Sequence, residues 1–274
     1  MREVLQATRH RRAEIKHRPP AQRGTWGRAL AAFEGRLHWH CHFMQKLESE
    51  PRFEFENMQR ATSGLRNPHC DPERLRAWKS GYTGWPLVDA CMRSLAHTGW
   101  INFRMRAMLM SVASYQLWLH WREPALHLAR LFVDYEPGIH YTQAQMQSGT
   151  TGINSLRIYN PVKQSLDQDR DGIFIRTWVP ELSRVDNSWI HTPWKMPAVT
   201  QRDCGVLIGR DYPAPLVDHE AAARQARQTI MQARRSADAR SESKSILARH
   251  GSRKRPQQRR RGGPQQASLF PDDA

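Results

Sequence analysis

Tryptophan is the residue type in this chain whose number most invites a chemical interpretation. An indole ring can stack on a flavin or on a nucleic-acid base, and it can equally fill a hydrophobic core. The number alone therefore does not decide between a binding surface and packing. The ten tryptophans all precede residue 220 and are Trp26, Trp39, Trp78, Trp85, Trp100, Trp118, Trp121, Trp178, Trp189 and Trp194.

A short histidine and cysteine cluster is a second candidate for chemistry. His38 and His42 are four residues apart, so on a helix they and Cys41 could share a face and hold a metal ion. No acidic or histidine partner follows at a fixed spacing, and we therefore predict no metal site. The cysteines form no Cys-x-x-Cys pair, which argues against a zinc ribbon, an iron–sulfur motif or a disulfide scaffold.

The charge of the chain points to an anionic partner. Residues 224–274 carry 13 basic and 4 acidic side chains, and the part before them is also basic, in a chain whose net charge is +16. Basic surfaces bind phosphates and release counterions, so the sequence predicts DNA as a partner. A tail that only maintains solubility is the alternative. No apolar stretch is long enough to span a membrane and no signal region follows Met1, so we expect a cytoplasmic protein.

The elements that must position these residues are helices. Apolar residues recur at spacings of three and four after Pro86, which predicts a helix over 86–95. The same pattern predicts a second helix over about 102–122 and a third from Pro124 to Phe132. Residues 172–175 are the only short candidate for a strand. The chain is therefore predicted to be all-α.

Composition divides the chain into three parts. Residues 1–219 contain the aromatic residues and are predicted to form the folded domain. Residues 220–250 contain good helix formers without a broad apolar stripe, so they are predicted to form a basic helix or linker, detached or frayed. Residues 251–274 cannot bury enough surface to offset chain entropy and are predicted to be a disordered basic tail.

Two segments carry a pattern that resembles a known family. Residues 81–95 read GYTGWPLVDACMRSL, and residues 98–106 read TGWINFRMR. Shorter matches follow in the same order as far as residue 182. The pattern resembles the helical FAD-binding domain of the DNA photolyase and cryptochrome family, and the resemblance spans roughly residues 1–220. It implies an all-α domain that holds FAD in a bent form, below a cavity for a flipped-out pyrimidine dimer.

The resemblance also implies which residues bind FAD. Arg106 matches the family arginine beside the isoalloxazine ring, and Asp134 matches the acid that pairs with it. Glu136 and His140 match positions close to the ring, where an imidazole could exchange protons with the reduced flavin. A packed histidine that takes no part in the chemistry is the alternative. The other residues expected to bind FAD are Phe33, Arg36, Trp39, His40, Phe43, Trp100, Phe103, Arg104 and Tyr135.

The residues that match the family's substrate cavity depart from its pattern. Trp39 matches the tryptophan that stacks on the flipped bases, whereas Arg36 replaces the catalytic glutamate that hydrogen-bonds to the dimer. An arginine cannot supply a proton at neutral pH, so repair of cyclobutane dimers is expected to be weak. Asn102, Phe103 and Ala107 stand where repair of the family's other photoproduct uses histidines, so that activity is less expected still.

The family's light-driven electron chain is matched in part. Trp121 corresponds to its middle tryptophan and Trp78 to its outer one, and both are expected to take part in catalysis. The innermost position holds Ala144, which Tyr141 or Trp118 could replace. The chain also begins with residues that resemble those just after the family's FAD-phosphate segment. We therefore expect either a fragment of a longer protein or a protein that binds FAD differently, or with a partner chain.

Three functions follow from these patterns as alternatives. The first is a photolyase-like lyase that binds FAD and DNA, and the second is a cryptochrome-like light or redox sensor without repair activity. The third is a domain without flavin that binds nucleic acid by charge. In addition, residues 266–270, QASLF, resemble the short motif that binds the bacterial sliding clamp, with Gln266, Leu269 and Phe270 as the expected contacts. A chance match, or a chain end that packs back on the domain, is the alternative.

Overall fold

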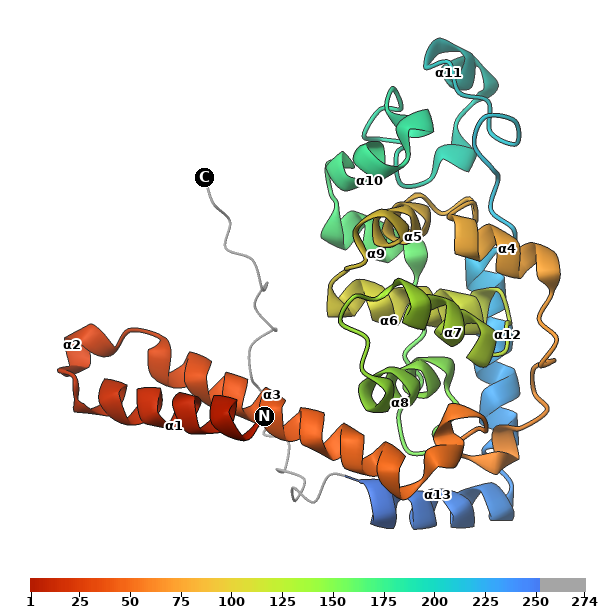
Figure 1. The fold of residues 1–274 in the computed structure, drawn as a ribbon. Helices are drawn as coiled ribbons and strands as arrows, with labels where there is room; N and C mark the ends of the chain where they lie inside the picture. Colours follow the sequence, from red (N-terminus) through yellow and green to blue (C-terminus); the bar gives the residue numbers. More distant parts are fainter. Residues whose placement is uncertain (252–274) are drawn as a thin grey trace, which may run out of the picture.

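Helices make up nearly all the regular structure of residues 1–251, the part of the chain that this computed structural model describes (Figure 1). Within these residues the only β pairing is one isolated bridge between Ile208 and Tyr212, so the predicted all-α class is confirmed. The α-helices are α1 (Arg2–His17), α2 (Pro20–Arg23), α3 (Trp26–Ser49), α4 (Pro72–Ser80), α5 (Pro86–Thr98), α6 (Phe103–Ser111), α7 (Arg122–Leu131), α8 (Pro137–Ser148), α9 (Pro161–Gln168), α10 (Ile173–Trp178), α11 (Ala198–Asp203), α12 (His219–Ala233) and α13 (Ala237–His250). Short 3-10 helices are η1 (Pro51–Glu54), η2 (Arg60–Thr62), η4 (Pro180–Leu182) and η5 (Pro193–Lys195), and η3 (Val112–Gln116) is a π-helical segment that continues α6.

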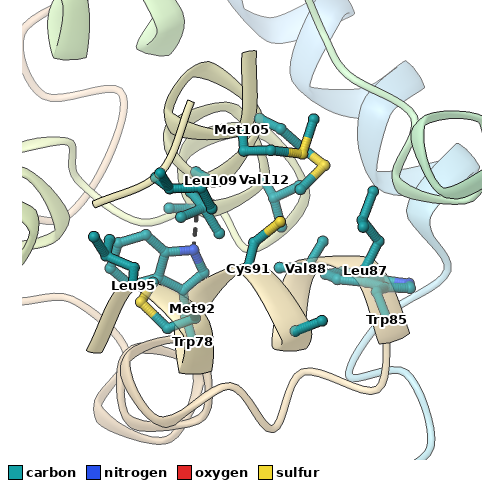
Figure 2. Close-up of a cluster of buried hydrophobic side chains, with 14 of the residues drawn as sticks. Trp78, Trp85, Leu87, Val88, Cys91, Met92, Leu95, Met105, Leu109 and Val112 are labelled. Carbon is teal, nitrogen blue, oxygen red and sulfur yellow. Dashed lines mark hydrogen bonds between the residues drawn. The ribbon is translucent and has the colours of Figure 1, made fainter. Parts of the chain in front are cut away.

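The core lies between α5 and α6, where Figure 2 shows the buried side chains of both helices. Helix α5 begins with Pro86 and ends at Thr98, and Gly99 follows it with a φ of 72°, which suits a residue without a Cβ. Trp78 of α4 is fully buried, and its indole N–H donates to the backbone oxygen of Leu109 at 3.1 Å (Figure 2). Burying such side chains stabilises the fold by about 1.5–3 kcal/mol each.

The buried carboxylate of Asp89 fixes the loop that precedes α5. It accepts hydrogen bonds from the backbone N–H and hydroxyl of Thr83 at 2.8 and 2.6 Å, and from the N–H of Gly84 at 3.0 Å. The hydroxyl of Tyr212, 123 residues further along the chain, donates to the same carboxylate. Burial raises the pKa of Asp89 to about 6 although these donors favour the charged form.

Helices α3 and α8 approach closely at one glycine. A Cβ added to Gly138 would lie 2.2 Å from Cε of Met44 and 2.7 Å from the backbone oxygen of Phe43, so only glycine allows this contact. The first half of α3 leaves the body of the molecule and pairs with α1 as an arm (Figure 1). Arg9 and Arg12 of α1 each form an ion pair with Glu34 of α3, at 3.2 and 3.0 Å.

Three expectations about secondary structure are wrong. The helix expected over 102–122 ends at Gln116, because Trp118 adopts a φ of 55° and the N–H of Leu119 bonds to the oxygen of Ala113 at 2.9 Å. The expected strand over 172–175 is the start of α10, which the carboxylate of Asp169 caps.

Residues 220–250 also differ from the expected detached helix, because they form most of α12 and all of α13. Ala226 and Ile230 of α12 are buried in a cluster with Tyr115, and Ile246 of α13 is buried against Phe53 and Met58. Each of these helices buries only two or three side chains, so the spacing of apolar residues in the sequence did not indicate burial.

No helix within residues 1–251 is long and apolar enough to cross a membrane. The predicted disordered tail lies, except for Gly251, outside the described residues, as do Gln266, Leu269 and Phe270 of the expected clamp motif.

Candidate functional site

A cavity of about 170 Å³ opens between α6, α7, α8 and the loop that connects α7 to α8. This volume is below the roughly 300–1,000 Å³ of pockets that enclose a whole drug-sized ligand, so the cavity can enclose only part of one. Six of the residues predicted to bind the cofactor lie together in its wall. They are Phe103, Arg106, Asp134, Tyr135, Glu136 and His140.

An ion pair between Arg106 and Asp134 holds one side of the cavity. The two guanidinium Nη atoms donate to the two carboxylate oxygens at 2.9 and 3.0 Å, the geometry in which such pairs are strongest. Arg106 also donates from Nε to the backbone oxygen of Ile101 at 2.7 Å, and its guanidinium lies 4.1 Å from the ring centroid of Phe132. The Arg106 side chain is 22% exposed and that of Asp134 is 49% exposed, so the arginine has one fixed orientation at the cavity wall.

Two glutamines of α8 present unpaired polar atoms in the same wall. The side-chain oxygens of Gln143 and Gln147 are buried and have no hydrogen-bond partner among the described residues. A buried acceptor without a donor costs about 1–3 kcal/mol, so these oxygens fit a ligand that donates N–H or O–H groups. These two residues belong to no recognised motif, and the only signal in the sequence is their spacing of four, which places them on one face of α8.

His140 is a fixed, neutral side chain in this wall. Its Nε2 lies 2.8 Å from the backbone oxygen of Ala125, to which only an N–H can donate, so Nδ1 is the bare acceptor. Burial lowers the pKa of His140 to about 4. At neutral pH the imidazole therefore carries a single proton, held by the carbonyl, which agrees with a packed histidine, the second of the two alternatives that the sequence left open.

The remaining predicted residues lie outside the cavity wall. His40 of α3 reaches the loop, where its Nε2 lies 3.3 Å from a carboxylate oxygen of Glu136. Trp39 is 45% exposed and lies in the wall of a different groove, beside α13. Five further residues line neither: Phe33, Arg36, Phe43, Trp100 and Arg104.

Of the two tryptophans expected in the electron chain, only Trp121 lies beside residues of the cavity. Trp121 is fully buried, donates to Oδ1 of Asn57 at 2.7 Å and meets Tyr141 edge-on, with ring centroids 6.4 Å apart. Tyr141 contacts the cavity residues His140 and Tyr135 at 5.4 and 6.5 Å between centroids.

Two tryptophans lie apart from this group. Trp78 packs against His127, with ring centroids 5.8 Å apart. The guanidinium carbon Cζ of Arg66 lies 4.4 Å from the ring centroid of Trp118. Of the two residues considered as replacements for Ala144, only Tyr141 therefore lies beside both Trp121 and the cavity.

Comparison with known proteins gives one family. Residues 33–232 match the model of the FAD binding domain of DNA photolyase. A deoxyribodipyrimidine photo-lyase of Streptomyces griseus is 38% identical over 214 residues, which are 77% of this chain and 44% of that protein. A cryptochrome DASH of Gloeobacter violaceus is 37% identical over 172 residues, 60% of this chain and 34% of that protein.

Solved structures agree with this assignment. The crystal structure of a class III photolyase from Agrobacterium tumefaciens matches with a TM-score of 0.70 and 26% identity, over 85% of this chain and 46% of that one. The structure of a Synechocystis cryptochrome matches with a TM-score of 0.70 and 27% identity, over 81% and 46% of the two chains. The chain thus spans less than half the length of these relatives.

Proposed function

Because the chain belongs to the photolyase and cryptochrome family through its FAD-binding domain, we propose that the cavity between α6, α7 and α8 holds the flavin ring for light-driven electron transfer. FAD is the cofactor of this domain family. The observation that carries the proposal is the group of unsatisfied and paired polar atoms around one small cavity: the Arg106–Asp134 pair and the bare oxygens of Gln143 and Gln147.

These residues fit a flavin by their chemistry. A ring with N–H donors would offer partners to the glutamine oxygens, and a ring that gains electrons would be stabilised by a guanidinium with a fixed orientation. The neutral Nδ1 of His140 accepts a further hydrogen bond, and the apolar part of the wall, with Phe103 and Phe132, excludes water. Bound FAD supplies light absorption and one-electron transfer, which none of the side chains can provide.

The chain's own residues suggest how electrons reach the cavity. Tyr141 lies between Trp121 and the residues of the cavity wall, and its hydroxyl donates to Oε1 of Glu54 at 3.2 Å. If Tyr141 passed one electron to the light-excited cofactor in the cavity, its phenolic proton could move to the Glu54 carboxylate along this hydrogen bond, and an electron from Trp121 with return of the proton would restore the tyrosine. Tyr141 thereby takes the role that the alanine at position 144 cannot.

The similarity to photo-lyases gives little support for repair of pyrimidine dimers by this chain. Arg36 is exposed on α3 and Trp39 lies in another groove, so neither is placed in the cavity wall. We therefore propose a flavoprotein that binds DNA through its basic surface and repairs cyclobutane dimers weakly. A light or redox sensor without repair activity is the second candidate, favoured by the arginine at position 36.

The test compares two buried glutamines whose side-chain oxygens both lack a hydrogen-bond partner. Gln147 and Gln164 are each more than nine-tenths buried with an unpartnered side-chain oxygen, but only Gln147 lines the cavity. We expect Gln147→Leu to weaken FAD binding about tenfold, in a titration followed by flavin fluorescence, and Gln164→Leu to leave it within about twofold. Equal affinities in the two variants would place the flavin elsewhere.

A further inference from the structure

We propose that a second cavity, between η3 and α12, binds a small phosphate monoester that also carries hydroxyl groups. This η3–α12 cavity has a volume of about 290 Å³, and its wall includes Gln116, Tyr159, Asn160, His219, Arg224 and Arg227. It shares no residue with the wall of the cavity between α6, α7 and α8. The two sites are therefore separate.

Gln116 supplies the η3–α12 cavity with a buried acceptor that has no donor. The residue is 2% exposed, and its Nε2 donates to the backbone oxygen of Tyr159 at 2.7 Å. That bond fixes the amide group and leaves Oε1 buried without a hydrogen-bond partner among the described residues. Because an unpaired buried acceptor is destabilising, the cavity favours a ligand that brings an O–H or N–H group.

Two arginines of α12 bring positive charge to the same cavity. Arg224 and Arg227 are three residues apart, so they lie on the same side of the helix. Arg227 forms no ion pair with any described residue, and Arg224 has only Glu220, at 3.9 Å with side chains 73% and 63% exposed. An ion pair so long and so exposed is weak. The two guanidinium groups therefore attract an anion, and together they match the double charge of a phosphate monoester.

The other polar residues of the wall bring no further negative charge. Burial lowers the pKa of His219, so its imidazole is neutral at neutral pH. Asn160 uses its Oδ1 to cap α9, accepting from the N–H groups of Val162 and Lys163 at 3.0 Å each. Its amide nitrogen donates to no described residue, so this nitrogen can donate to an oxygen of the ligand.

Packing behind the wall fixes these groups in place. Ala226 and Ile230 of α12 are buried against Tyr115 of η3, and Ile158 packs on the same cluster. Gln116 is the next residue of this π-helical segment, a geometry that often occurs at functional sites. Because η3 and α12 are held together without a ligand, the acceptor and the cations are already arranged, which lowers the cost of binding.

The volume of the η3–α12 cavity selects a small ligand. About 290 Å³ is at the lower end of the roughly 300–1,000 Å³ of small-molecule pockets, so the cavity cannot enclose a nucleic-acid strand. A pentose phosphate has the required parts, because its phosphate can contact the two arginines while a hydroxyl donates to Oε1 of Gln116.

Calorimetric titration of the full chain with ribose 5-phosphate tests the proposal. We expect a Kd below about 1 mM, and at least about tenfold weaker binding of ribose and of inorganic phosphate, because each makes only one of the two kinds of contact. Failure of ribose 5-phosphate to bind, or equal affinity for inorganic phosphate, would overturn the proposal. Displacement of ribose 5-phosphate by FAD would also overturn it, because the cavity would then belong to the phosphates of the cofactor.

Matched variants show whether the ligand lies in the η3–α12 cavity. Gln116→Met and Gln164→Met each remove a buried amide whose oxygen has no partner, but only Gln116 lines the cavity. Arg227→Gln and Arg240→Gln each remove one exposed arginine, the first from the cavity wall and the second from α13. We expect Gln116→Met to weaken binding about fivefold and Arg227→Gln about tenfold, and the two controls to change it less than about twofold.

Equal effects within either pair of variants would place the ligand elsewhere on the basic surface. The arginine pair decides the question if Gln116→Met does not fold, because the side chain of Arg227 is exposed and its replacement removes no packing.

Discussion

Replacing Asp134 with asparagine tests the ion pair that orients Arg106 in the cavity wall. Asp134→Asn keeps the size of the side chain but replaces one acceptor oxygen by an NH2 group that faces the guanidinium. Breaking a fully buried pair costs about 3–5 kcal/mol and an exposed pair contributes about 0–1 kcal/mol. Because the side chains are 22% and 49% exposed, we expect a loss of about 1–2 kcal/mol in the free energy of unfolding.

The assay is urea unfolding at neutral pH with Asp167→Asn as the control. Asp167 pairs with Lys163 at 3.1 Å, but these side chains are 42% and 70% exposed, so its replacement should cost less than about 0.5 kcal/mol. Added FAD should also stabilise the Asp134→Asn protein less than the parent, since ligand stabilisation follows affinity. Equal losses in the two variants, or equal stabilisation by FAD, would refute the role given to the Arg106–Asp134 pair.

Three other measurements test separate parts of the structure. Gly138→Ala should lower the free energy of unfolding by about 1–3 kcal/mol, because the added Cβ would collide with Met44. Gly35→Ala is the control and should not lower it, because a Cβ there meets no atom within 4 Å. Similar urea midpoints for the two variants would contradict the close α3–α8 contact. Folding raises the pKa of Asp89 to about 6 from an ordinary 3.8, so the stability that its bound proton contributes is full below about pH 4 and is lost as pH rises through 6. The difference in free energy of unfolding between the parent and Asp89→Asn should therefore shrink from pH 4 to pH 7. A difference that stays constant over this range would be inconsistent with a raised pKa. Duplex DNA should bind about tenfold or more weakly at roughly 200 mM than at 50 mM salt, and binding insensitive to salt would exclude a basic surface as the contact.

The sequence paired Arg106 with Asp134, but it did not indicate which other side chains form the cavity wall. The motif around Arg106 and the acid at Asp134 are 28 residues apart in the chain, and resemblance to a family was enough to pair them. Gln143 and Gln147 belong to no motif, and their unpaired oxygens become visible only once α8 is packed. Trp39 was expected beside the flavin because it follows a family pattern, but it lies about 100° around the helix from His40.

Local backbone events explain the other differences. The left-handed φ of Trp118 ends a helix where the residue type gives no signal, because glycine and asparagine are the usual residues at such positions. The capping of α10 by Asp169 depends on a turn between them that apolar spacing does not reveal.

The most direct test of the central claim is the absorption spectrum of the purified chain after it has been mixed with FAD and passed through a desalting column. The structure predicts that the protein fraction retains flavin at less than one per chain, with Arg106→Ala retaining much less still, because the cavity wall supplies the specific contacts. A folded chain, judged by circular dichroism, that elutes without flavin would contradict the claim.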